Sequence, residues 1–488
     1  MKENSSTNCN SSLEYGHSNR PARLKLSERQ GLSDRRVHPD PASDRHAPRA
    51  GEPGPSTASS SALLSSTWPF SLDDLPEAAY LVGGSVRDGL LARQTTHLDL
   101  DFVLAEGAVD TARSIAQRYG AGFVLLDAER AIARVVFPDA TADFAQQMGD
   151  SLEDDLRRRD FTINAIAYSP HRNQFVDPLN GASDLKQNRL CMVNAQNLKD
   201  DPLRLLRAYR QAAQLGFYLD AETQQSIREL AQSICTVAPE RVYAEISYLL
   251  NAPNAGTDQL IQSWRDGLLQ PWLPDVSADS LAEVARIDGA ARTLATANPA
   301  FGRSLDGWIR DQQQAAGVGR SWIKVAKLSC LTPNPARAES QLWRLKCSRA
   351  EVQAVLLLLE LRGPLREAAA DGALWAGLTR RQQYELFKQV GAAFPAVALV
   401  AIALGVCCDR VIEMMQRFVD ADDPVAHPNP LLTGHDLMAE LDLKPSRQMG
   451  YLLESLSLAH AESKIFDAQT AIAFAQAWLQ DADKNQLM

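Results

Sequence analysis

The sequence lacks the features that would place the protein outside the cell or in a membrane. Its seven cysteines are scattered, no two of them form a CxxC pair and no secretory signal is recognisable, so we expect neither a disulfide framework nor a zinc site. The longest apolar run, residues 396–408, is well short of the roughly 20 residues that cross a bilayer, which predicts a buried helix there. We therefore expect a cytoplasmic protein with no membrane partner.

The sequence also lacks an excess of positive charge. Its 50 lysines and arginines against 60 acidic residues give a formal charge of −10, which is not the global signature of a nucleic-acid-binding protein. Arginines are nevertheless concentrated in Leu156–Phe161 and in Arg204–Arg210. If RNA binds, we expect it to bind at such local patches.

Aromatic and β-branched residues are scarce at the N-terminus, and this scarcity marks the first of several segments. Residues 1–66 cannot bury enough apolar surface to offset the entropy of ordering, which predicts a disordered tail. Short β-rich runs then alternate with one clear helix, and after about residue 194 only helical spacing remains. We thus expect an α+β protein, with a head at 67–192 followed by a helical neck (193–265), a helical body (266–425) and a helical tail (426–488).

Two aspartates, Asp99 and Asp101, lie one residue apart on a predicted strand. Because side chains alternate along a strand, both carboxylates face the same side a few ångströms apart. Like charges so close repel, whereas Mg²⁺ would keep both ionised and accept their hard oxygens as ligands. For an isolated pair of this kind, a solvated strand edge is the better interpretation.

A double glycine strengthens the functional interpretation of the pair. Gly83 and Gly84 directly follow a predicted strand and open a predicted helix, so backbone N–H groups at a helix N-terminus face a potential phosphate. Arg87 adds a guanidinium in the first turn of that helix. A glycine turn, an arginine and a carboxylate pair in one short stretch favour metal-assisted displacement at a phosphate.

The stretch that carries these residues, Tyr80–Leu104, resembles the signature of the nucleotidyltransferase superfamily that includes DNA polymerase beta. The form is that of class II (bacterial-type) tRNA nucleotidyltransferases and their poly(A) polymerase relatives. Five further stretches match in family order: Asp155–Tyr168, Val176–Leu190, Asp200–Phe217, Ala238–Leu250 and Pro430–Glu462. The resemblance implies a polymerase-beta-like head, built from a small mixed sheet with helices, ahead of an all-α neck, body and tail.

The resemblance also implies roles for particular residues. Asp99 and Asp101 would be the catalytic residues and would hold Mg²⁺. The implied nucleotide-binding set is Gly83, Gly84, Arg87, Arg159, Asp160, Asn164, Asp201, Arg204 and Arg207. Within it the glycines and Arg87 would bind the triphosphate, and Arg159 would help to hold the nucleotide. Asp160 and Asn164, which we expect at i and i+4 on one helix face, would read the ribose hydroxyls.

The resemblance implies that Asp201, Arg204 and Arg207 select the base. These residues are spaced i, i+3 and i+6 along a predicted helix. An aspartate that accepts from an exocyclic amine and an arginine that donates to the ring fit both cytosine and adenine. Guanine and uracil present a carbonyl where the carboxylate needs an amine. The alternative is that Asp201 only caps its own helix.

Three features depart from the family pattern or match it loosely. Asp143 is a loose match to a third metal carboxylate of the superfamily. Gln211 stands where the family usually has phenylalanine, which we interpret as an exchange in the core with little bearing on the chemistry. Only Gln146–Asp150 separate a predicted strand from the next helix, where many CCA-adding members carry a longer loop implicated in the switch to adding A.

The sequence therefore predicts template-independent addition of CCA, or part of it, to the 3′ end of tRNA from CTP and ATP with Mg²⁺ as cofactor. A specialised CC-adding or A-adding enzyme and a poly(A) polymerase are alternatives within the same family. A non-catalytic RNA-binding protein is the alternative from another class. The oligomeric state is left open.

Overall fold

The computed structural model describes residues 61–93, 97–252, 254–306, 321–371 and 377–486. Residues 1–60, most of the predicted tail, lie outside the described residues. The end of that predicted segment is ordered, because Ser61–Leu63 and Ser65–Thr67 form 3₁₀ turns. Ala62 is buried, and its carbonyl oxygen accepts a hydrogen bond from Trp68 Nε1 at 3.0 Å. The folded part thus begins before the predicted boundary at residue 66.

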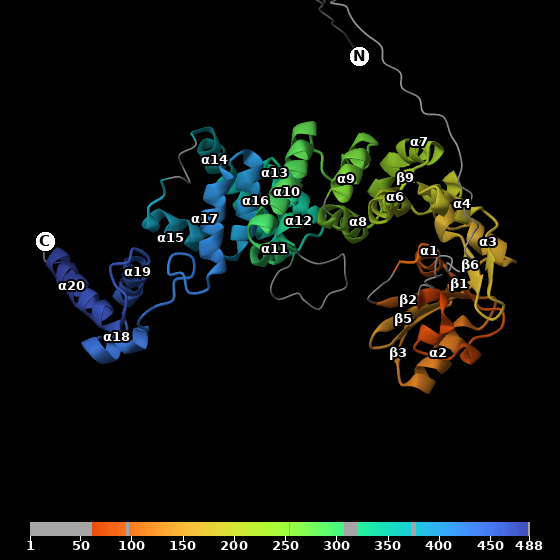
Figure 1. Ribbon diagram of the computed structural model, residues 1–488, viewed down its shortest axis with the longest axis horizontal. Helices are drawn as coiled ribbons and strands as arrows, with labels where there is room; N and C mark the ends of the chain where they lie inside the picture. Colours follow the sequence, from red (N-terminus) through yellow and green to blue (C-terminus); the bar gives the residue numbers. More distant parts are fainter. Residues whose placement is uncertain (1–60, 94–96, 253, 307–320, 372–376, 487–488) are drawn as a thin grey trace, which may run out of the picture. The chain divides into compact units, whose positions relative to one another are not determined.

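Seven strands of the head form one mixed sheet (Figure 1). Strands β2 and β5 run parallel, and the other neighbouring strands are antiparallel. Their order is β3 (Gly122–Asp127), β4 (Ile132–Val136), β5 (Ala140–Gln146), β2 (Leu98–Leu104), β1 (Tyr80–Val82), β6 (Ala167–Ser169) and β7 (Gln174–Val176). All the predicted head strands are present in this sheet, and of its seven strands the edge strand β7 was not predicted.

The two faces of the sheet differ in composition because side chains alternate along each strand. Helix α2 (Ala108–Tyr119) packs against β4 and β5 and covers one face, where Phe102 and Phe144 are buried. As predicted, α2 ends at Gly120, which adopts the left-handed conformation with φ +64°. The alternation places Asp99 and Asp101 on the opposite face of β2, away from this core.

Short helices follow the strands in the rest of the head. They are α1 (Gly84–Leu90), α3 (Leu152–Arg157) and α4 (Gly181–Lys186). A two-residue strand, β8 (Arg189–Leu190), pairs in parallel with β9 (Tyr218–Leu219). Strand β9 lies beyond residue 194, where we expected no strand, and two residues are too few to leave a period-two pattern in the sequence.

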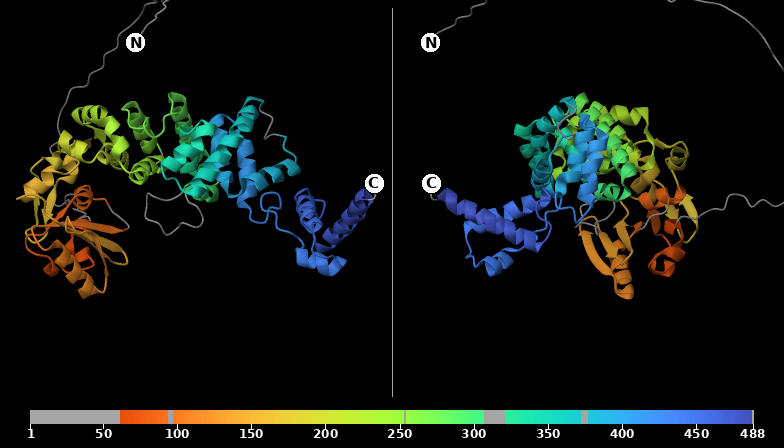
Figure 2. Two further views of the ribbon diagram at one scale, coloured as in Figure 1. Left: turned by 180° about the vertical axis from the view of Figure 1, so that it is seen from behind. Right: turned by 60° about the vertical axis from the view of Figure 1, so that its left-hand side comes forward.

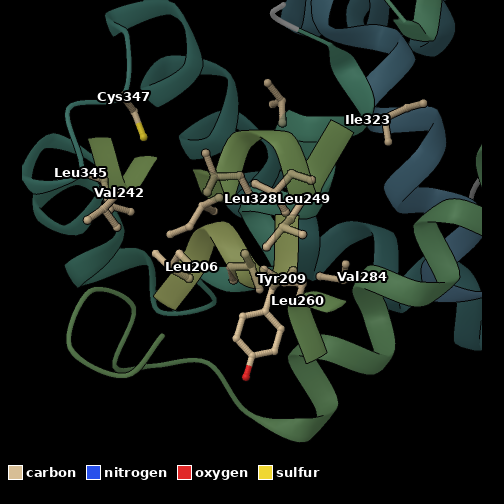
Figure 3. Close-up of a cluster of buried hydrophobic side chains, with 14 of the residues drawn as sticks. Leu206, Tyr209, Val242, Leu249, Leu260, Val284, Ile323, Leu328, Leu345 and Cys347 are labelled. Atoms are coloured by element: carbon tan, nitrogen blue, oxygen red, sulfur yellow. The ribbon is translucent and has the colours of Figure 1, made fainter. Parts of the chain in front are cut away.

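The remainder is helical, as predicted. The neck and body contain α5 (Ala195–Asp200), α6 (Leu203–Leu215), α7 (Ala221–Leu230), α8 (Pro239–Asn251), α9 (Ala255–Arg265), α10 (Ala278–Ala297), α11 (Pro299–Asp306), α12 (Trp322–Leu331), α13 (Pro335–Arg344), α14 (Arg349–Asp371), α15 (Arg380–Val390), α16 (Phe394–Leu404) and α17 (Cys408–Val419). Leu206 and Tyr209 of α6 are buried among apolar side chains that include Val242 and Leu249 of α8 (Figure 3). This core fixes one face of α6 and leaves its other face for the site described below.

One segment, Arg380–Leu404, is long and apolar enough by length and composition to cross a membrane. Its most apolar stretch is 67% buried inside the protein, and a 3₁₀ turn at Gly391–Ala393 divides it into α15 and α16. The predicted buried helix is thus confirmed as α16, a core helix.

The tail helices have an apolar cluster of their own. Helices α18 (Gly434–Leu441), α19 (Arg447–Ala461) and α20 (Ala468–Gln486) lie together at the C-terminal end of the chain (Figure 2). Their buried apolar residues include Leu437 and Leu452.

Candidate active site

The double glycine brings the start of α1 against strand β2. The backbone of Gly83 has φ +72° and ψ −135°, a conformation that residues with a Cβ rarely adopt. A Cβ at this position would lie 3.4 Å from both Asp101 Oδ2 and Arg159 NH1, so the turn lies directly over these two side chains. Ser85 fastens the helix to the strand, since its hydroxyl donates to Asp99 O at 2.8 Å and accepts from Asp101 N at 3.3 Å. Sequence reasoning did not single out Ser85.

Asp99 and Asp101 share the open face of β2, as the i, i+2 spacing predicted. Asp99 is exposed and accepts a hydrogen bond from Thr141 Oγ1. Burial, together with the negative charges of Asp99 and Asp143, raises the pKa of Asp101 to about 7. A divalent cation would offset this repulsion and favour the ionised form of both carboxylates. The donor set therefore fits a hard cation such as Mg²⁺.

Asp143 does not complete a metal site in this structure. It lies beside Asp101 in the parallel register of β2 and β5, but Arg134 of β4 binds it with two hydrogen bonds, of 2.6 and 2.8 Å. Among the described residues, no group of three or more His, Cys, Asp or Glu side chains is arranged to hold a metal. The candidate protein ligands are thus Asp99 and Asp101.

A cavity of about 500 Å³ opens beside this carboxylate pair. It is lined by Gly83, Gly84, Arg87, Asp99, Asp101, Arg158, Arg159, Asp160, Asn164, Arg204, Arg207, Arg210 and Gln211. The structure therefore brings together every predicted site residue except Asp201, and it adds Arg158, Arg210 and Gln211. In Arg159, Arg204 and Arg207 the Nε atom is buried without a hydrogen-bond partner among the described residues. Such buried donors fit an anionic ligand that supplies the acceptors.

A buried carboxylate that sequence reasoning missed holds two of these arginines. Asp155 of α3 is fully buried, and its Oδ1 accepts from Arg158 NH2 at 2.7 Å and from Met148 N at 3.1 Å. Its Oδ2 accepts from Arg159 NH2 at 3.2 Å. Arg158 and Arg159 are therefore positioned by one anchor. The signal for Asp155 lay in its place at i−3 and i−4 from the two arginines.

Asp160 and Asn164 do not share a helix face, contrary to the prediction. Helix α3 ends at Arg157, and Asn164 belongs to a separate 3₁₀ turn, Thr162–Asn164. The two side chains nevertheless meet, since Asn164 Nδ2 donates to Asp160 Oδ1 at 2.9 Å. Burial opposes ionisation of Asp160, but the charge of Arg207 and the hydrogen bond from Asn164 hold the pKa of that carboxyl below its usual range.

Asp201, the predicted base-reading carboxylate, does not line the cavity. Its Oδ2 accepts from Arg241 NH2 of α8 at 3.1 Å, and its Oδ1 lies 3.4 Å from Leu203 N at the start of α6. Arg204 and Arg207 do line the cavity. Arg204 donates to the carbonyl oxygens of Arg158 and Asn197, both at 3.0 Å.

Side chains of helix α8 contact two arginines of α6, Arg207 and Arg210. Glu245 is buried, accepts from Arg210 Nε at 2.5 Å and lies 3.6 Å from Arg207 Nε. The Tyr248 ring lies under the Arg210 guanidinium, 5.3 Å from ring centroid to Cζ. These contacts fix the directions of two guanidinium groups that face the cavity.

A second, smaller cavity of about 170 Å³ reaches the same carboxylates. It shares Gly84, Arg87, Asp99 and Asp101 with the first cavity, and its lining includes Arg93 and His97. The two aspartates thus lie where two cavities meet, which suits a reaction between two substrates.

Comparisons with known proteins identify the family of the chain. The family described as the Poly A polymerase head domain matches residues 79–191, the RNA and SrmB-binding site of polymerase A matches residues 216–279, and tRNA nucleotidyltransferase domain 2 matches residues 320–475. A CC-adding tRNA nucleotidyltransferase of Synechocystis sp. is 45% identical over 84% of this chain and 95% of that protein. The chain belongs to the tRNA nucleotidyltransferase family. The predicted family and enzyme class are thus confirmed, and this family generally uses a divalent metal.

Other members of the family differ in the product that their names give. A CC-adding tRNA nucleotidyltransferase of Geobacter sulfurreducens is 33% identical over 79% of this chain and 89% of that protein. An A-adding tRNA nucleotidyltransferase of Deinococcus radiodurans is 32% identical over 84% and 98%, respectively. A solved CCA-adding enzyme with CTP has a TM-score of 0.63 at 18% identity, over 82% of this chain and 91% of that one. The predicted fold class, a nucleotidyltransferase head followed by helices, is thereby confirmed.

Proposed function

We propose that this tRNA nucleotidyltransferase adds two C residues to the 3′ end of tRNA, using CTP and Mg²⁺ and no nucleic-acid template, and stops there. The observation that carries the reaction class is the carboxylate pair Asp99 and Asp101 at the edge of a cavity lined by six arginines. Carboxylates hold a hard cation, and guanidinium groups bind phosphates.

Asp99 and Asp101 are the residues that would hold Mg²⁺. A bound metal there would stabilise charge on the attacking 3′-hydroxyl oxygen of the RNA and on the leaving pyrophosphate oxygen. Ser85 contributes by bonding Asp99 O and Asp101 N, the backbone between the two aspartates, which helps to keep the spacing of the two carboxylates fixed. The second cavity, with Arg93 and His97, is a suitable entrance for the RNA 3′ end because it reaches the same two aspartates.

The triphosphate is assigned to the α1 turn and its arginines. Backbone N–H groups after Gly83 and Gly84 face outward at a helix start, and the missing Cβ atoms allow close approach. Arg159 is the principal guanidinium because its NH1 lies beside the glycine turn, 3.4 Å from where a Cβ of Gly83 would be. Its Nε has no hydrogen-bond partner among the described residues, and Asp155 fixes its direction through NH2. Arg87 is engaged with Asp88 and Asn164, so it acts mainly by positioning Asn164 and by its charge.

The base is assigned to Arg204 and Asp201. Arg204 already lines the cavity, but the Asp201 carboxylate must leave Arg241 to accept from an exocyclic amine. That ion pair is partly exposed, with 51% of the Arg241 side chain accessible, and such pairs contribute only about 0–1 kcal/mol. The exchange therefore costs little compared with a hydrogen bond to the correct base.

The short connection between β5 and α3 favours CC as the product. β5 ends at Gln146 and α3 begins at Leu152, which leaves no room for the longer loop that the resemblance associates with adding A. The relative with 45% identity is named for CC addition. Because the matched relative is named as a tRNA nucleotidyltransferase, we place the enzyme with tRNA in the cytoplasm.

The test supplies purified protein and Mg²⁺ with tRNA transcripts that end at the discriminator base, after one added C, or after CC. CTP and ATP are offered separately and together. The proposal expects the first two transcripts to gain C up to CC and the third to remain unchanged. Addition of A to the CC transcript would contradict the proposal and show that the enzyme adds either the full CCA end or A alone. A long A tract would identify a poly(A) polymerase. No extension of any transcript would favour a non-catalytic RNA-binding protein.

A further inference from the structure

The orientation of one amide in the cavity is fixed by a chain of hydrogen bonds that starts at Arg87. Arg87 NH1 donates to Asn164 Oδ1 at 2.8 Å, and because a guanidinium can only donate, this atom of Asn164 must be the oxygen. Asn164 Nδ2 then donates to Asp160 Oδ1 at 2.9 Å, an oxygen of a carboxylate whose low pKa keeps it ionised. Both ends of the Asn164 amide are thus assigned.

The same chain orients Gln211 of α6. The second hydrogen of Asn164 Nδ2 is donated to Gln211 Oε1 at 3.0 Å. The oxygen of Gln211 therefore points at Asn164, and its Nε2 group, with two hydrogens, is left to the cavity. Gln211 is 95% buried, at 5% relative exposure, and within the described part of the chain no hydrogen-bond partner is found for Nε2. Gln211 lines the cavity and its Nε2 is accessible from it, so this donor is held in a fixed direction for an acceptor of a bound ligand.

Gln211 differs from the arginines beside it on the cavity face of α6, because it is a neutral donor and they are charged. Arg204, Arg207 and Gln211 are spaced i, i+3 and i+7 and line the cavity together, whereas Leu206 and Tyr209 face the core (Figure 3). Guanidinium groups are donors only, so they provide no acceptor for Gln211, and they are the better partners for charged phosphate oxygens. A neutral amide of fixed direction suits a neutral acceptor instead.

We propose that Gln211 is a nucleotide-specificity residue, whose Nε2 donates to a neutral oxygen of the bound nucleotide, either a sugar hydroxyl or the base carbonyl. The proposal rests on the function proposed above and names a contact within the same site. It corrects two expectations from the sequence. Gln211 is not an exchange in the core, and Asn164, with both N–H groups engaged, positions Gln211 rather than donating to the ribose itself.

The test measures binding of CTP to the full chain without tRNA. Gln211→Met removes the donor at nearly constant volume, and Gln225→Met, on an exposed glutamine of α7, is the matched control. We expect the dissociation constant for CTP to rise roughly three- to tenfold in Gln211→Met and to stay unchanged in the control. Inorganic triphosphate should bind both variants as it binds the wild type. Gln211→Phe, which carries the aromatic residue usual in the family, replaces the Met variant if the latter has a lowered thermal midpoint.

A second titration, with 2′,3′-dideoxyCTP, shows whether the acceptor belongs to the sugar or to the base, because this analogue lacks both sugar hydroxyls. If a hydroxyl is the acceptor, the Met variant and the wild type bind this analogue equally well. If the base carbonyl is the acceptor, the variant is weakened for CTP and for the analogue alike. CTP affinity within twofold of the wild type, or an equal loss for triphosphate and CTP, would overturn the proposal, as would undetectable CTP binding by the wild type. Intact CTP binding without tRNA extension would overturn only the proposed function.

Discussion

Asp155 offers the most direct test of how the arginine-lined cavity is held. We predict that Asp155→Asn destabilises the head and weakens nucleotide binding. The buried carboxylate accepts from Arg158, Arg159 and a backbone N–H, and asparagine keeps the volume but turns one acceptor into a donor that faces a guanidinium. A hydrogen bond to a charged group contributes about 1.5–3 kcal/mol. Arg158 is 46% exposed, so its share is discounted to at most about 1 kcal/mol.

The expected loss is therefore about 2–3 kcal/mol, which corresponds to a fall of roughly 4–12 °C in the thermal midpoint of the head. Release of Arg159 should also raise the dissociation constant for CTP by about tenfold. Both quantities are measured by thermal melts and by CTP titration. The control is Glu153→Gln on the same helix, whose exposed pair with Arg157 contributes only about 0.3–0.5 kcal/mol. If Asp155→Asn behaves like this control in both assays, Asp155 does not anchor the arginines.

Three further predictions concern the turn, the carboxylate pair and the charge network. Gly83→Ala should lower activity and thermal stability, because a backbone with φ +72° costs about 1–3 kcal/mol for alanine. Gly363→Ala should not, because Gly363 is an exposed position of α14 with open space around it. Asp101→Ala should keep tRNA binding in a gel-shift assay and lose nucleotide incorporation by roughly 10²-fold or more; undiminished incorporation would contradict the metal assignment. The pKa of Asp160 is lowered in the folded protein. The stability that its ionised carboxylate contributes is therefore fully present above the unfolded-state pKa of about 3.9 and is lost as the pH falls through the folded pKa. The difference in thermal midpoint between the wild type and Asp160→Asn should therefore shrink from pH 6 to pH 3, and a constant difference would argue against this account.

The parts of the site that the sequence predicted are those set by neighbours in the chain. Asp99 and Asp101 share a face because strand side chains alternate, and Gly83 adopts a conformation that its place between a strand and a helix requires. The same local logic predicted α2 and its end at Gly120. Periodicity and glycine position suffice for such features.

The parts that were missed or misplaced depend on contacts between distant segments. Asn164 and Gln211 are 47 residues apart, and Asp201 and Arg241 are 40 apart, so no periodic pattern connects either pair. Asp160 and Asn164 were expected on one helix because i, i+4 spacing is typical of helices, but α3 ends at Arg157. Gln211 was assigned to the core because the family usually has phenylalanine at its position, and only the structure shows that it lines the cavity.

The row of charges across the sheet also bears on how faithfully the head folds. Arg134 of β4 lies opposite Asp143 of β5, which lies beside Asp101 of β2. A slip of β4 by one residue would turn Arg134 to the other face of the sheet and leave two carboxylates side by side without their cation. The repulsion between these two carboxylates therefore destabilises a sheet in which β4 is paired out of register. The charges of the candidate metal site therefore also favour the correct pairing of the neighbouring strands during folding.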